Sequence, residues 1–407
     1  MSTVPSGLRP VCMIVHAYYE EDSRVRREAE SLVAMGRPVD VFALRRPGDP
    51  PAGVIDGVAL RRLDVQRHQG AGLGTYVREY LAFLFRAGWA VTRAHRRRHY
   101  AVVQVHTLPD FLVFAALPLR IARVPVILDL HEAMPEFFRM RFPRASSRVA
   151  HGLLGFLERI SIKFASAAIT VNDALAARLV SIGVKPEKVT VLLNSPSLTR
   201  FDPEMHPRRT FMADGTLRLV YAGALTPTYE LDVTIDAVAR VRALRPDLPV
   251  VFDVFGRGDS EGALRERAAR LGIGDAVVLH GRIPIEDVPA AIAAADIGLA
   301  PTRRDPFTDF SLSTKIFEYG AMGKPVVASR LPLVERTFPP GSVATYLPGD
   351  AESLATAILG LIDDPARREA AVAATRVRIG ELSWDHESER LWELIDRLAA
   401  DGLSSRG

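Results

Sequence analysis

The chain has little of several features that mark particular classes of protein. Its 407 residues include a single cysteine, Cys12, which excludes an internal disulfide and a cysteine-based zinc cluster and favours a reducing, cytoplasmic location. No apolar run approaches the roughly 18–20 residues that a bilayer-spanning helix needs. The first residues also lack the basic and apolar pattern of a secretory signal, so we expect no export.

Two sequence motifs of nucleotide-binding enzymes are missing as well. No Asp-x-Asp occurs, and paired carboxylates at that spacing usually hold a divalent cation against a nucleotide diphosphate. No strand–GxGxxG–helix unit occurs either, which argues against a dinucleotide-dependent oxidoreductase. We therefore expect any nucleotide chemistry of this chain to proceed without a metal site and without a bound cofactor.

The chain does contain a charge imbalance between its two halves. The whole sequence carries a net charge of +4, from 52 Lys and Arg against 48 Asp and Glu. Residues 1–200 carry +11 and the remaining residues carry −7. Such an asymmetry indicates an anionic partner for the basic half, a membrane surface or a lipid phosphate rather than nucleic acid. Drift in an arginine-rich proteome gives the same pattern, and both interpretations stand.

Short apolar segments alternate with helical patterns along almost the whole chain. The length exceeds one comfortable hydrophobic core, so two domains are expected. Runs of valine, isoleucine and leucine predict buried parallel strands at 11–15, 38–44, 102–105, 126–130, 168–171, 189–193, 217–221, 250–254, 277–279, 297–300, 325–328 and 344–347. The helical stretches between them, such as 22–35, 231–244 and 262–271, predict two doubly wound Rossmann-like α/β domains that face a central cleft.

A polar stretch with several prolines, 195–216, separates the two series of elements. Its composition is typical of an interdomain linker. We place the N-terminal domain at 1–200, the C-terminal domain at 201–383 and a final helical segment at 384–407. The tryptophans of that last segment, Trp384 and Trp392, indicate packing against an apolar surface.

Residues 76–98 form an unusual helical pattern with two interpretations. The charged residues fall within roughly 100° of the helical wheel, and most of the remaining positions up to residue 94 are apolar. In one interpretation the helix covers the N-terminal sheet and keeps a single wet stripe. In the other it lies in a membrane interface with its basic end, Arg96, Arg97 and Arg98, toward anionic lipid at the inner face of the membrane. Serine at those three positions tests the second interpretation, because it should weaken binding to anionic vesicles.

The segment 313–329 carries the strongest chemical signal. A helix is expected to begin at Ser313, an N-cap residue type, and to end at Gly323. The free N–H groups at a helix N-terminus bind phosphate, and Lys315 would add a positive charge beside them. Glu318, one turn later, is suited to accept hydrogen bonds from a ribose diol. An ordinary surface helix is the alternative.

Residues 313–329 resemble the signature of glycosyltransferase family 4, a large family of retaining enzymes with the GT-B fold. In the C-terminal half, similar motifs occur in the expected order at 220–225, 231–237, 254–258, 280–284 and 294–301. In the N-terminal half, 22–29, 129–132 and 192–195 are similar to the bacterial subgroup whose first loop is not glycine-rich. The resemblance covers nearly the whole chain.

The resemblance implies a retaining, metal-independent transfer of a sugar from a nucleotide-diphosphate-sugar to an acceptor hydroxyl. The C-terminal domain would bind the donor, and the N-terminal domain would present a glycan, lipid-linked or small-molecule acceptor. The final helix would cross back to the N-terminal domain. Front-face displacement, in which the departing phosphate helps to deprotonate the acceptor, is the implied mechanism. Assembly of a cell-surface glycan or glycolipid is the implied setting.

The resemblance also assigns roles to individual residues. His131 resembles the active-site histidine, although it could instead be a structural cap of its strand. Asp309 is a second catalytic candidate. The donor-binding candidates are Gly223, Arg257, Arg282, Ser311, Leu312, Ser313, Lys315 and Glu318, and the candidates on the acceptor or diphosphate side are Arg24, Asp110 and Glu132. Arg24, expected in the first β–α loop, is either a diphosphate ligand or a solvated arginine at a helix start.

Three positions depart from the family pattern. Phe310 stands where the first of two glutamates is common, with Asp309 one residue earlier as a substitute. Ala224 replaces an arginine, and Tyr229 with Glu230 occupies the region of a diphosphate-binding lysine. An anionic diphosphate still needs donors. These departures keep two alternatives open: a nucleotide-sugar epimerase of the GT-B fold, and an inactive sugar-nucleotide-binding partner of another transferase.

Overall fold

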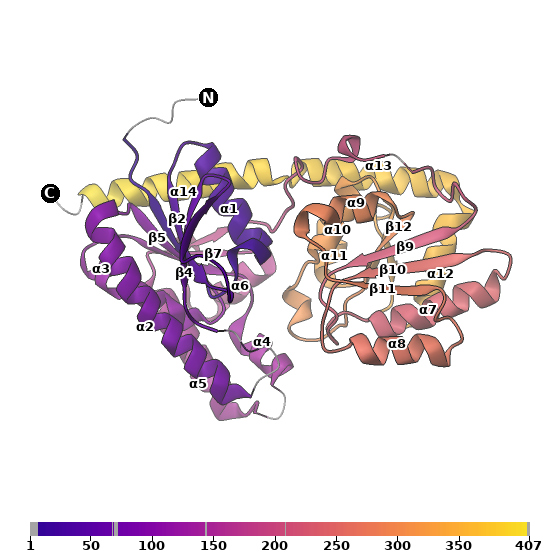
Figure 1. Ribbon diagram of the computed structural model, residues 1–407, viewed down its shortest axis with the longest axis horizontal. Coiled ribbons are helices and arrows are strands. Elements are labelled where there is room, and N and C mark those ends of the chain that lie inside the picture. The colour runs from indigo at the N-terminus through magenta and orange to yellow at the C-terminus, as the bar shows by residue number, and fades with distance from the viewer. Residues whose placement is uncertain (1–6, 67, 69–71, 143–144, 208, 405–407) are drawn as a thin grey trace. The chain divides into compact units, whose positions relative to one another are not determined.

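The computed structural model describes residues 7–66, 68, 72–142, 145–207 and 209–404 of the chain. It divides into two compact units, one formed by Met1–Asn194 with Asp385–Gly407 and the other by Ser195–Trp384. Each unit is an α/β sandwich with helices on both faces of a mainly parallel sheet (Figure 1). The predicted class of two Rossmann-like domains is therefore confirmed.

The first unit is built on a sheet of eight strands in the order β3-β4-β2-β1-β5-β6-β7-β8. All neighbouring pairs are parallel except β3 and β4. The strands are β1 Val11–Ile14, β2 Val39–Leu44, β3 Ala52–Ile55, β4 Val58–Leu63, β5 Val102–His106, β6 Val126–Leu130, β7 Ala167–Thr170 and β8 Val189–Val191. The central strands are buried along their whole length, as continuous apolar runs in parallel sheets should be.

Helices pack on this sheet through alternating strand residues. Cys12 and Ile14 of β1 share a core with Phe83, Ala87 and Val91, so these strand positions face the longest helix of the unit. The helices are α1 Ser23–Ala34, α2 Leu73–Arg98, α3 Leu117–Ile121, α4 Met134–Arg141, α5 Arg148–Phe164 and α6 Asp173–Ser181, with 3₁₀ turns η1 Tyr19–Glu21, η2 Asp110–Ala116 and η3 Pro186–Lys188. None of the helices in the described part of the chain is long and apolar enough to cross a membrane.

The second unit has a six-stranded parallel sheet in the order β11-β10-β9-β12-β13-β14. Its strands are β9 Leu217–Ala222, β10 Val250–Phe255, β11 Val277–Gly281, β12 Ile297–Ala300, β13 Val326–Ser329 and β14 Ala344–Tyr346. The helices are α7 Leu231–Leu244, α8 Glu261–Arg270, α9 Val288–Ala293, α10 Thr314–Ala321, α11 Pro332–Thr337, α12 Ala351–Asp363 and α13 Pro365–Glu381. The turns η4 Pro203–Met205, η5 Ile285–Asp287 and η6 Thr308–Phe310 complete it.

Two separate cores hold the second unit together. On one face of the sheet, α7, α8 and α12 bury residues such as Val238, Leu264 and Ile358. On the other face, α9, α10, α11 and α13 bury Ile316 and Ile379 among others. Helix α10, which carries the strongest sequence signal, is thus fixed to its sheet by the core on that face.

The final helix, α14 Trp384–Ser404, packs on the first unit (Figure 1). The guanidinium of Arg37 pairs with Asp396 and lies 4.9 Å from the centroid of the Trp392 ring. The carboxylate of Glu387 accepts a hydrogen bond of 3.0 Å from the backbone N–H of Leu193, in the loop that follows β8. Helix α14 therefore closes the first unit and supports the end of its last strand.

Three expectations from the sequence need correction. The antiparallel pair β3–β4 was not predicted, although its two-residue Asp56-Gly57 turn, with φ of 49° and 79°, is a common hairpin signal. The stretch 195–216 is not a free linker, because Phe201 is buried in a core of the second unit. The helix predicted to end at Gly323 ends at Ala321, and Gly323 follows it with a φ of 67°.

Helix α2 also differs from the interpretation with one wet stripe. Glu79, expected on that stripe, is buried and accepts a hydrogen bond of 3.2 Å from the backbone N–H of His68. Phe85 and Trp89 are instead exposed to solvent, on the side of the helix opposite Phe83. The helix therefore covers the sheet with one face and presents large apolar side chains on the other.

Candidate active site

Strand order determines where each sheet can receive a ligand. In doubly wound sheets the crevice lies beyond the carboxyl ends of the two strands at which the order reverses. In the first unit these strands are β1 and β5, and in the second they are β9 and β12. The residues that follow these strand ends are therefore the ones that a ligand of each unit would contact.

A buried charged cluster lies near the switch point of the first unit. Arg24, in the first turn of α1, donates hydrogen bonds of 3.2 and 3.0 Å to the two carboxylate oxygens of Asp129 on β6. It donates a third, of 3.2 Å, to the carbonyl of Leu192. Arg24 lies in α1 rather than in the preceding loop, and at 3% exposed it is not the solvated arginine of the alternative. Its role as a diphosphate ligand stays a prediction. Its cation is committed to holding three segments of the unit together.

Two histidines share the same aspartate. Nδ1 of His106, at the end of β5, lies 3.0 Å from Oδ2 of Asp129, and Nε2 of His131 lies 3.3 Å from that oxygen. The backbone N–H of His131 donates to the hydroxyl of Thr107 at 3.1 Å. His106 is fully buried, whereas the side chain of His131 is 19% exposed. His131 is thus oriented by Asp129 and remains accessible to a reacting group.

Glu28, which was not among the predicted site residues, completes this cluster on its buried side. Glu28 lies 3.0 Å from Arg24 and accepts a hydrogen bond of 2.6 Å from the amide of Gln104. Burial, together with the negative charge of Asp129, raises the pKa of Glu28 to about 7. Burial would raise the pKa of Asp129 as well, but Arg24 and the two histidines outweigh it and hold that pKa well below its usual range.

The two other carboxylates predicted in this unit lie in different surroundings. Glu132 follows His131 and is partly buried, and loss of solvation raises its pKa to about 7, with His131 acting in the opposite direction. Asp110, at the start of η2, is 2% exposed. Burial and the nearby Glu158 raise the pKa of Asp110 well above its usual range. Within the described residues no hydrogen bond joins Asp110 to the Asp129 cluster.

The ligand atoms of His106, Asp129 and His131 lie within 4.8 Å of one another, a spacing that a metal ion could use. Such an ion would have to compete with the guanidinium of Arg24, which already bonds to both oxygens of Asp129. The donor set therefore fits a charge-balanced hydrogen-bond network better than a metal site.

In the second unit, backbone packing shapes the switch point. Gly223 follows β9, and a Cβ atom there would come within 2.5 Å of Cε of Lys315. Gly256 follows β10 with a φ of 149°, and a Cβ atom there would lie 1.8 Å from the carbonyl oxygen of Gly223. Two strand ends thus approach each other closely, and the aliphatic part of Lys315 passes over Gly223 because no side chain blocks it.

Lys315 is held in an unusual environment. It is 7% exposed, and its ammonium lies 4.1 Å from the ring centroid of Tyr229 and 5.1 Å from that of Tyr221. Among the described residues no carboxylate forms an ion pair with it. The aromatic faces stabilise the cation without neutralising it. Lys315 is therefore a buried side chain surrounded by aromatic faces rather than by a carboxylate of the described structure.

The N-terminus of α10 lies beside this lysine. Ser313 is the N-cap residue, as predicted, but its side chain makes no capping hydrogen bond, and its buried Oγ has no partner in the described structure. The first N–H groups of any helix lack an intrahelical acceptor. Leu312 is partly buried, and the N–H of Ser311 already donates to the carbonyl of Thr308 at 3.0 Å. The available donors therefore begin after Ser311.

The remaining predicted donor-side residues are spread around these strand ends. Glu318 is partly buried on α10, four residues after its first residue. Arg257 and Arg282 are exposed and follow β10 and β11, at the same edge of the sheet. Asp309, the second catalytic candidate, lies in η6 and pairs with Arg304 at 3.2 Å with 39% of its side chain exposed.

Comparison with protein families divides the chain in the same way. Residues 22–195 match the profile described as "Glycosyl transferase 4-like domain". Residues 216–364 match the profile described as "Glycosyl transferases group 1". Together these matches cover most of both units.

Curated relatives are similar to parts or to most of the chain. A Corynebacterium glutamicum GDP-mannose-dependent monoacylated alpha-(1-6)-phosphatidylinositol monomannoside mannosyltransferase is 30% identical over 213 residues, 52% of this chain and 55% of the relative. A Stackebrandtia nassauensis D-inositol 3-phosphate glycosyltransferase is 29% identical over 237 residues, which are 55% of this chain and 52% of the relative. The chain thus spans about half the length of these relatives. A Mycobacterium tuberculosis glycogen synthase is 24% identical over 377 residues, which are 88% of this chain and 86% of the relative.

Solved structures share the fold at low sequence identity. Sucrose-phosphate synthase from Thermosynechococcus elongatus superposes with a TM-score of 0.78 at 19% identity, over 97% of this chain and all of that one. Anabaena Alr3699/HepE in complex with UDP-glucose gives a TM-score of 0.70 at 16% identity, over 96% of this chain and all of that one. These likenesses show the fold of two Rossmann-like units.

Proposed function

Since this chain belongs to glycosyltransferase family 4, whose members have the GT-B fold, we propose that it transfers a sugar from a nucleotide-diphosphate-sugar to an acceptor hydroxyl. The second unit binds the donor, and the first unit supplies His131 and the acceptor side. The observation that carries the proposal is Lys315, a buried cation beside the N-terminus of α10 with no carboxylate partner in the described structure.

The donor diphosphate needs positive charge and hydrogen-bond donors, and the second unit offers both. Lys315 supplies a charge that is desolvated and therefore acts strongly on a phosphate. The N-terminus of α10 adds N–H groups and the positive end of the helix dipole. The ammonium of Lys315 lies over the ring of Tyr229, the residue in the region where the family pattern has a lysine. Lys315 thus compensates for that departure, and Glu318 is proposed to bind the ribose.

In the first unit, His131 is the proposed catalytic residue. Asp129 accepts from its Nε2, and the network through Arg24 keeps that aspartate ionised. An imidazole held in this way contacts the transferring sugar or the acceptor hydroxyl and stabilises charge in the transition state. We propose retention of the anomeric configuration, with the departing phosphate taking the acceptor proton, and a reaction that requires neither a metal nor a cofactor.

Relatives suggest which substrates to try first. The named relatives use GDP-mannose, phosphatidylinositol mannosides and inositol 3-phosphate, and Alr3699/HepE binds UDP-glucose. We propose that this chain uses a UDP- or GDP-hexose and an acceptor that carries a polyol or a lipid phosphate, in a cytoplasmic setting.

Thermal unfolding in the presence of a panel of nucleotide-sugars tests the donor. A donor that binds the folded state raises the melting temperature by mass action. The stabilising donor is then incubated with candidate acceptors, and release of nucleoside diphosphate is followed with and without added EDTA. We expect acceptor-dependent release that EDTA leaves unchanged, and an α-linked product from an α-linked donor by NMR. Loss of activity with EDTA, restored by a divalent cation, would overturn metal independence.

The same mixture separates the two rival functions. A nucleotide-sugar epimerase converts the donor to its epimer with no acceptor present. An inactive partner protein binds the donor and releases no diphosphate with any acceptor.

A further inference from the structure

Helices α2 and α5 of the first unit expose large apolar side chains along their outer faces. On α2 these are Leu73, Val77, Leu81, Phe85 and Trp89, spaced four residues apart. Residues at this spacing form one stripe along a helix. Phe85 is 71% exposed and Trp89 is 68% exposed. The stripe therefore places two aromatic rings in water, on the side of α2 that faces away from the sheet.

Helix α5 repeats this arrangement. Val149, Leu153 and Phe156 follow one another at helical spacing and are exposed, and Val149 reaches 81%. Helices α2 and α5 both pack against η2, and Phe164 of α5 contacts Phe114 of η2 with 5.1 Å between ring centroids. Figure 1 shows both helices on the same flank of the first unit. We call the eight apolar residues of α2 and α5 the outer stripe.

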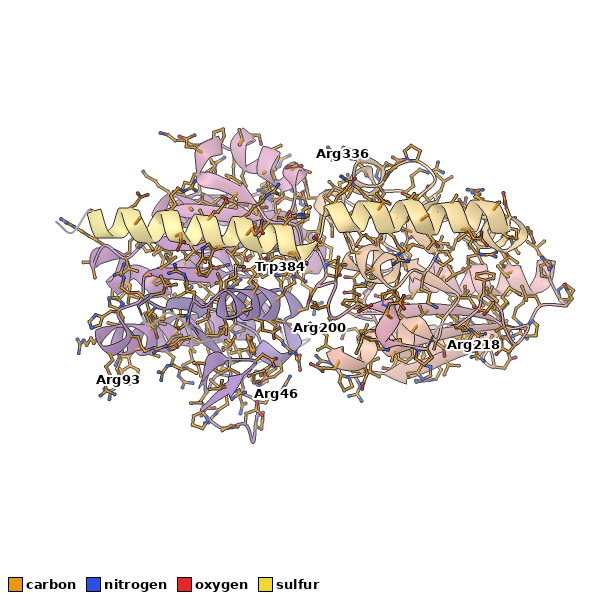
Figure 2. The ribbon with its side chains drawn as sticks, turned by 90° about the horizontal axis from the view of Figure 1, so that it is seen from above. Arg46, Arg93, Arg200, Arg218, Arg336 and Trp384 are labelled. Atoms are coloured by element: carbon orange, nitrogen blue, oxygen red, sulfur yellow. The ribbon has the colours of Figure 1, made fainter. Side chains whose placement is uncertain are left out.

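The charges around the outer stripe are of one sign. The exposed charged residues of the two helices are all basic: Arg78, Arg86, Arg93, Arg96, Arg97 and Arg98 on α2, and Arg148, Arg159 and Lys163 on α5. Each helix contains one acidic residue, and both are buried, Glu79 against His68 and Glu158 against Arg178. Figure 2 shows Arg93 at the outer edge of this unit, and its guanidinium lies 5.7 Å from the centroid of the Trp89 ring.

We propose that the outer stripe docks the first unit onto the surface of an anionic phospholipid bilayer. Aromatic and aliphatic side chains enter the boundary between headgroups and acyl chains, and the flanking arginines pair with lipid phosphates. A second copy of the chain fits the stripe poorly, because two identical faces would bring their arginines together without a carboxylate between them. The proposal does not depend on sugar transfer.

The structure also corrects which arginines can test this surface. Arg98 donates to both carboxylate oxygens of the buried Asp40, at 3.0 and 2.7 Å. Its replacement would leave a buried charge without its partner and would damage the fold. Arg78 and Arg93 are exposed and have no carboxylate partner in the described structure, so they are the better choice.

The test is co-sedimentation of the full chain with vesicles of phosphatidylcholine alone or mixed with phosphatidylglycerol. We expect the wild type to sediment with the anionic vesicles and to stay in solution with the neutral ones. The double variant Phe85→Ser/Trp89→Ser should bind about tenfold more weakly than the wild type. Arg78→Ser/Arg93→Ser should bind more weakly than the wild type at low salt, and its binding should fall less than that of the wild type as salt is raised. The matched control Leu244→Ser/Val377→Ser removes exposed apolar residues of the second unit and should bind like the wild type.

Three results would overturn the proposal. The first is a wild type that stays in solution with anionic vesicles, and the second is an apolar double variant that binds as tightly as the wild type. The third is a wild-type dimer, seen by light scattering, that Phe85→Ser/Trp89→Ser converts to a monomer, because the stripe is then a protein interface. Thermal unfolding confirms that each variant is folded. Tryptophan fluorescence gives a second readout, since entry of the Trp89 indole into a bilayer shifts emission to shorter wavelength. The double variant without Trp89 shows what Trp384 and Trp392 contribute.

Discussion

The two units differ in the groups that lie near their switch points. The first unit gathers ionised side chains from distant segments, Arg24, Glu28, Asp129 and His131 among them, and bonds them to one another. The second unit relies on backbone: two glycines, the N-terminus of α10 and one lysine between aromatic rings. The difference teaches that the first cluster balances its charges internally, whereas the second keeps a buried lysine with which no carboxylate pairs among the described residues.

The largest effect expected is the loss of the central cation of the first unit. Arg24→Met leaves Asp129 and Glu28 buried without their counter-ion and should lower the free energy of unfolding by about 3–5 kcal/mol. Urea unfolding followed by circular dichroism measures it. Arg45→Met, which removes a pair of 2.8 Å with the exposed Asp64, should change stability by about 1 kcal/mol or less. Equal effects of the two substitutions would show that the buried cluster is not special.

In the second unit, a side chain added at Gly256 should lower the stability. Gly256→Ala forces a Cβ atom against the carbonyl of Gly223 at a positive φ, and should cost about 3 kcal/mol of stability. It should also weaken donor binding, because Gly223 and Lys315 adjoin the same strand end. The control is Gly262→Ala in α8, where a Cβ atom meets no atom within 4 Å. That substitution should leave stability unchanged or raise it by up to about 1 kcal/mol. A tolerated alanine at 256 contradicts the close approach of the strands.

The tuned carboxylates of the first unit should make stability depend on pH. The pKa of Glu132 is raised to about 7 in the folded state, above the value of about 4.3 expected in the unfolded chain. A raised carboxyl pKa contributes stability that is complete below the unfolded value and is lost as pH rises through the folded one. Between pH 4.5 and 7.5 the wild type should therefore lose on the order of 1–3 kcal/mol relative to Glu132→Gln.

Unfolding curves at several pH values provide that comparison. Glu187→Gln, which changes a side chain that is 73% exposed, serves as the control and should follow the wild type at every pH. If Glu132→Gln has the same pH profile as the wild type, burial does not tune this carboxylate.

The smallest effect concerns the ribose contact of the second unit. Glu318→Ala should weaken binding of the donor nucleotide by about 1–2 kcal/mol through the loss of a hydrogen bond to a charged acceptor. Isothermal titration with the nucleotide selected in the thermal panel measures it. Glu335→Ala, on the following helix and 58% exposed, should bind normally. Unchanged affinity of Glu318→Ala would remove this residue from the donor site.

The sequence predicted most of the fold because each element is specified locally. The expected bounds 231–244 match α7, and β9, β10 and β12 lie within one residue of the predicted strands. Apolar runs and helical periodicity depend only on neighbours in the chain. The β3–β4 hairpin was not predicted, although the turn signal at Asp56-Gly57 was present. Its short strands are half exposed and so lack the continuous apolar run that predicts a buried strand.

The site was less predictable, for a physical reason. His131 and Asp129 belong to a recognisable motif, but His106, Gln104 and Glu28 join them from β5 and α1 through contacts that span up to 76 residues along the chain. No local pattern records such a contact. Lys315 was predicted as a phosphate ligand, whereas its position over the ring of Tyr229 follows only from the packing of α10 against β9.

The central claim is that donor binding belongs to the second unit and His131 to the reaction. Isothermal titration of the donor nucleotide into the wild type, Lys315→Met and His131→Ala tests it most directly, with turnover measured on the same samples. We predict that Lys315→Met binds the nucleotide about 10- to 100-fold more weakly, while His131→Ala binds it like the wild type and loses turnover. Normal binding by Lys315→Met, together with lost binding by His131→Ala, would contradict this division between the units.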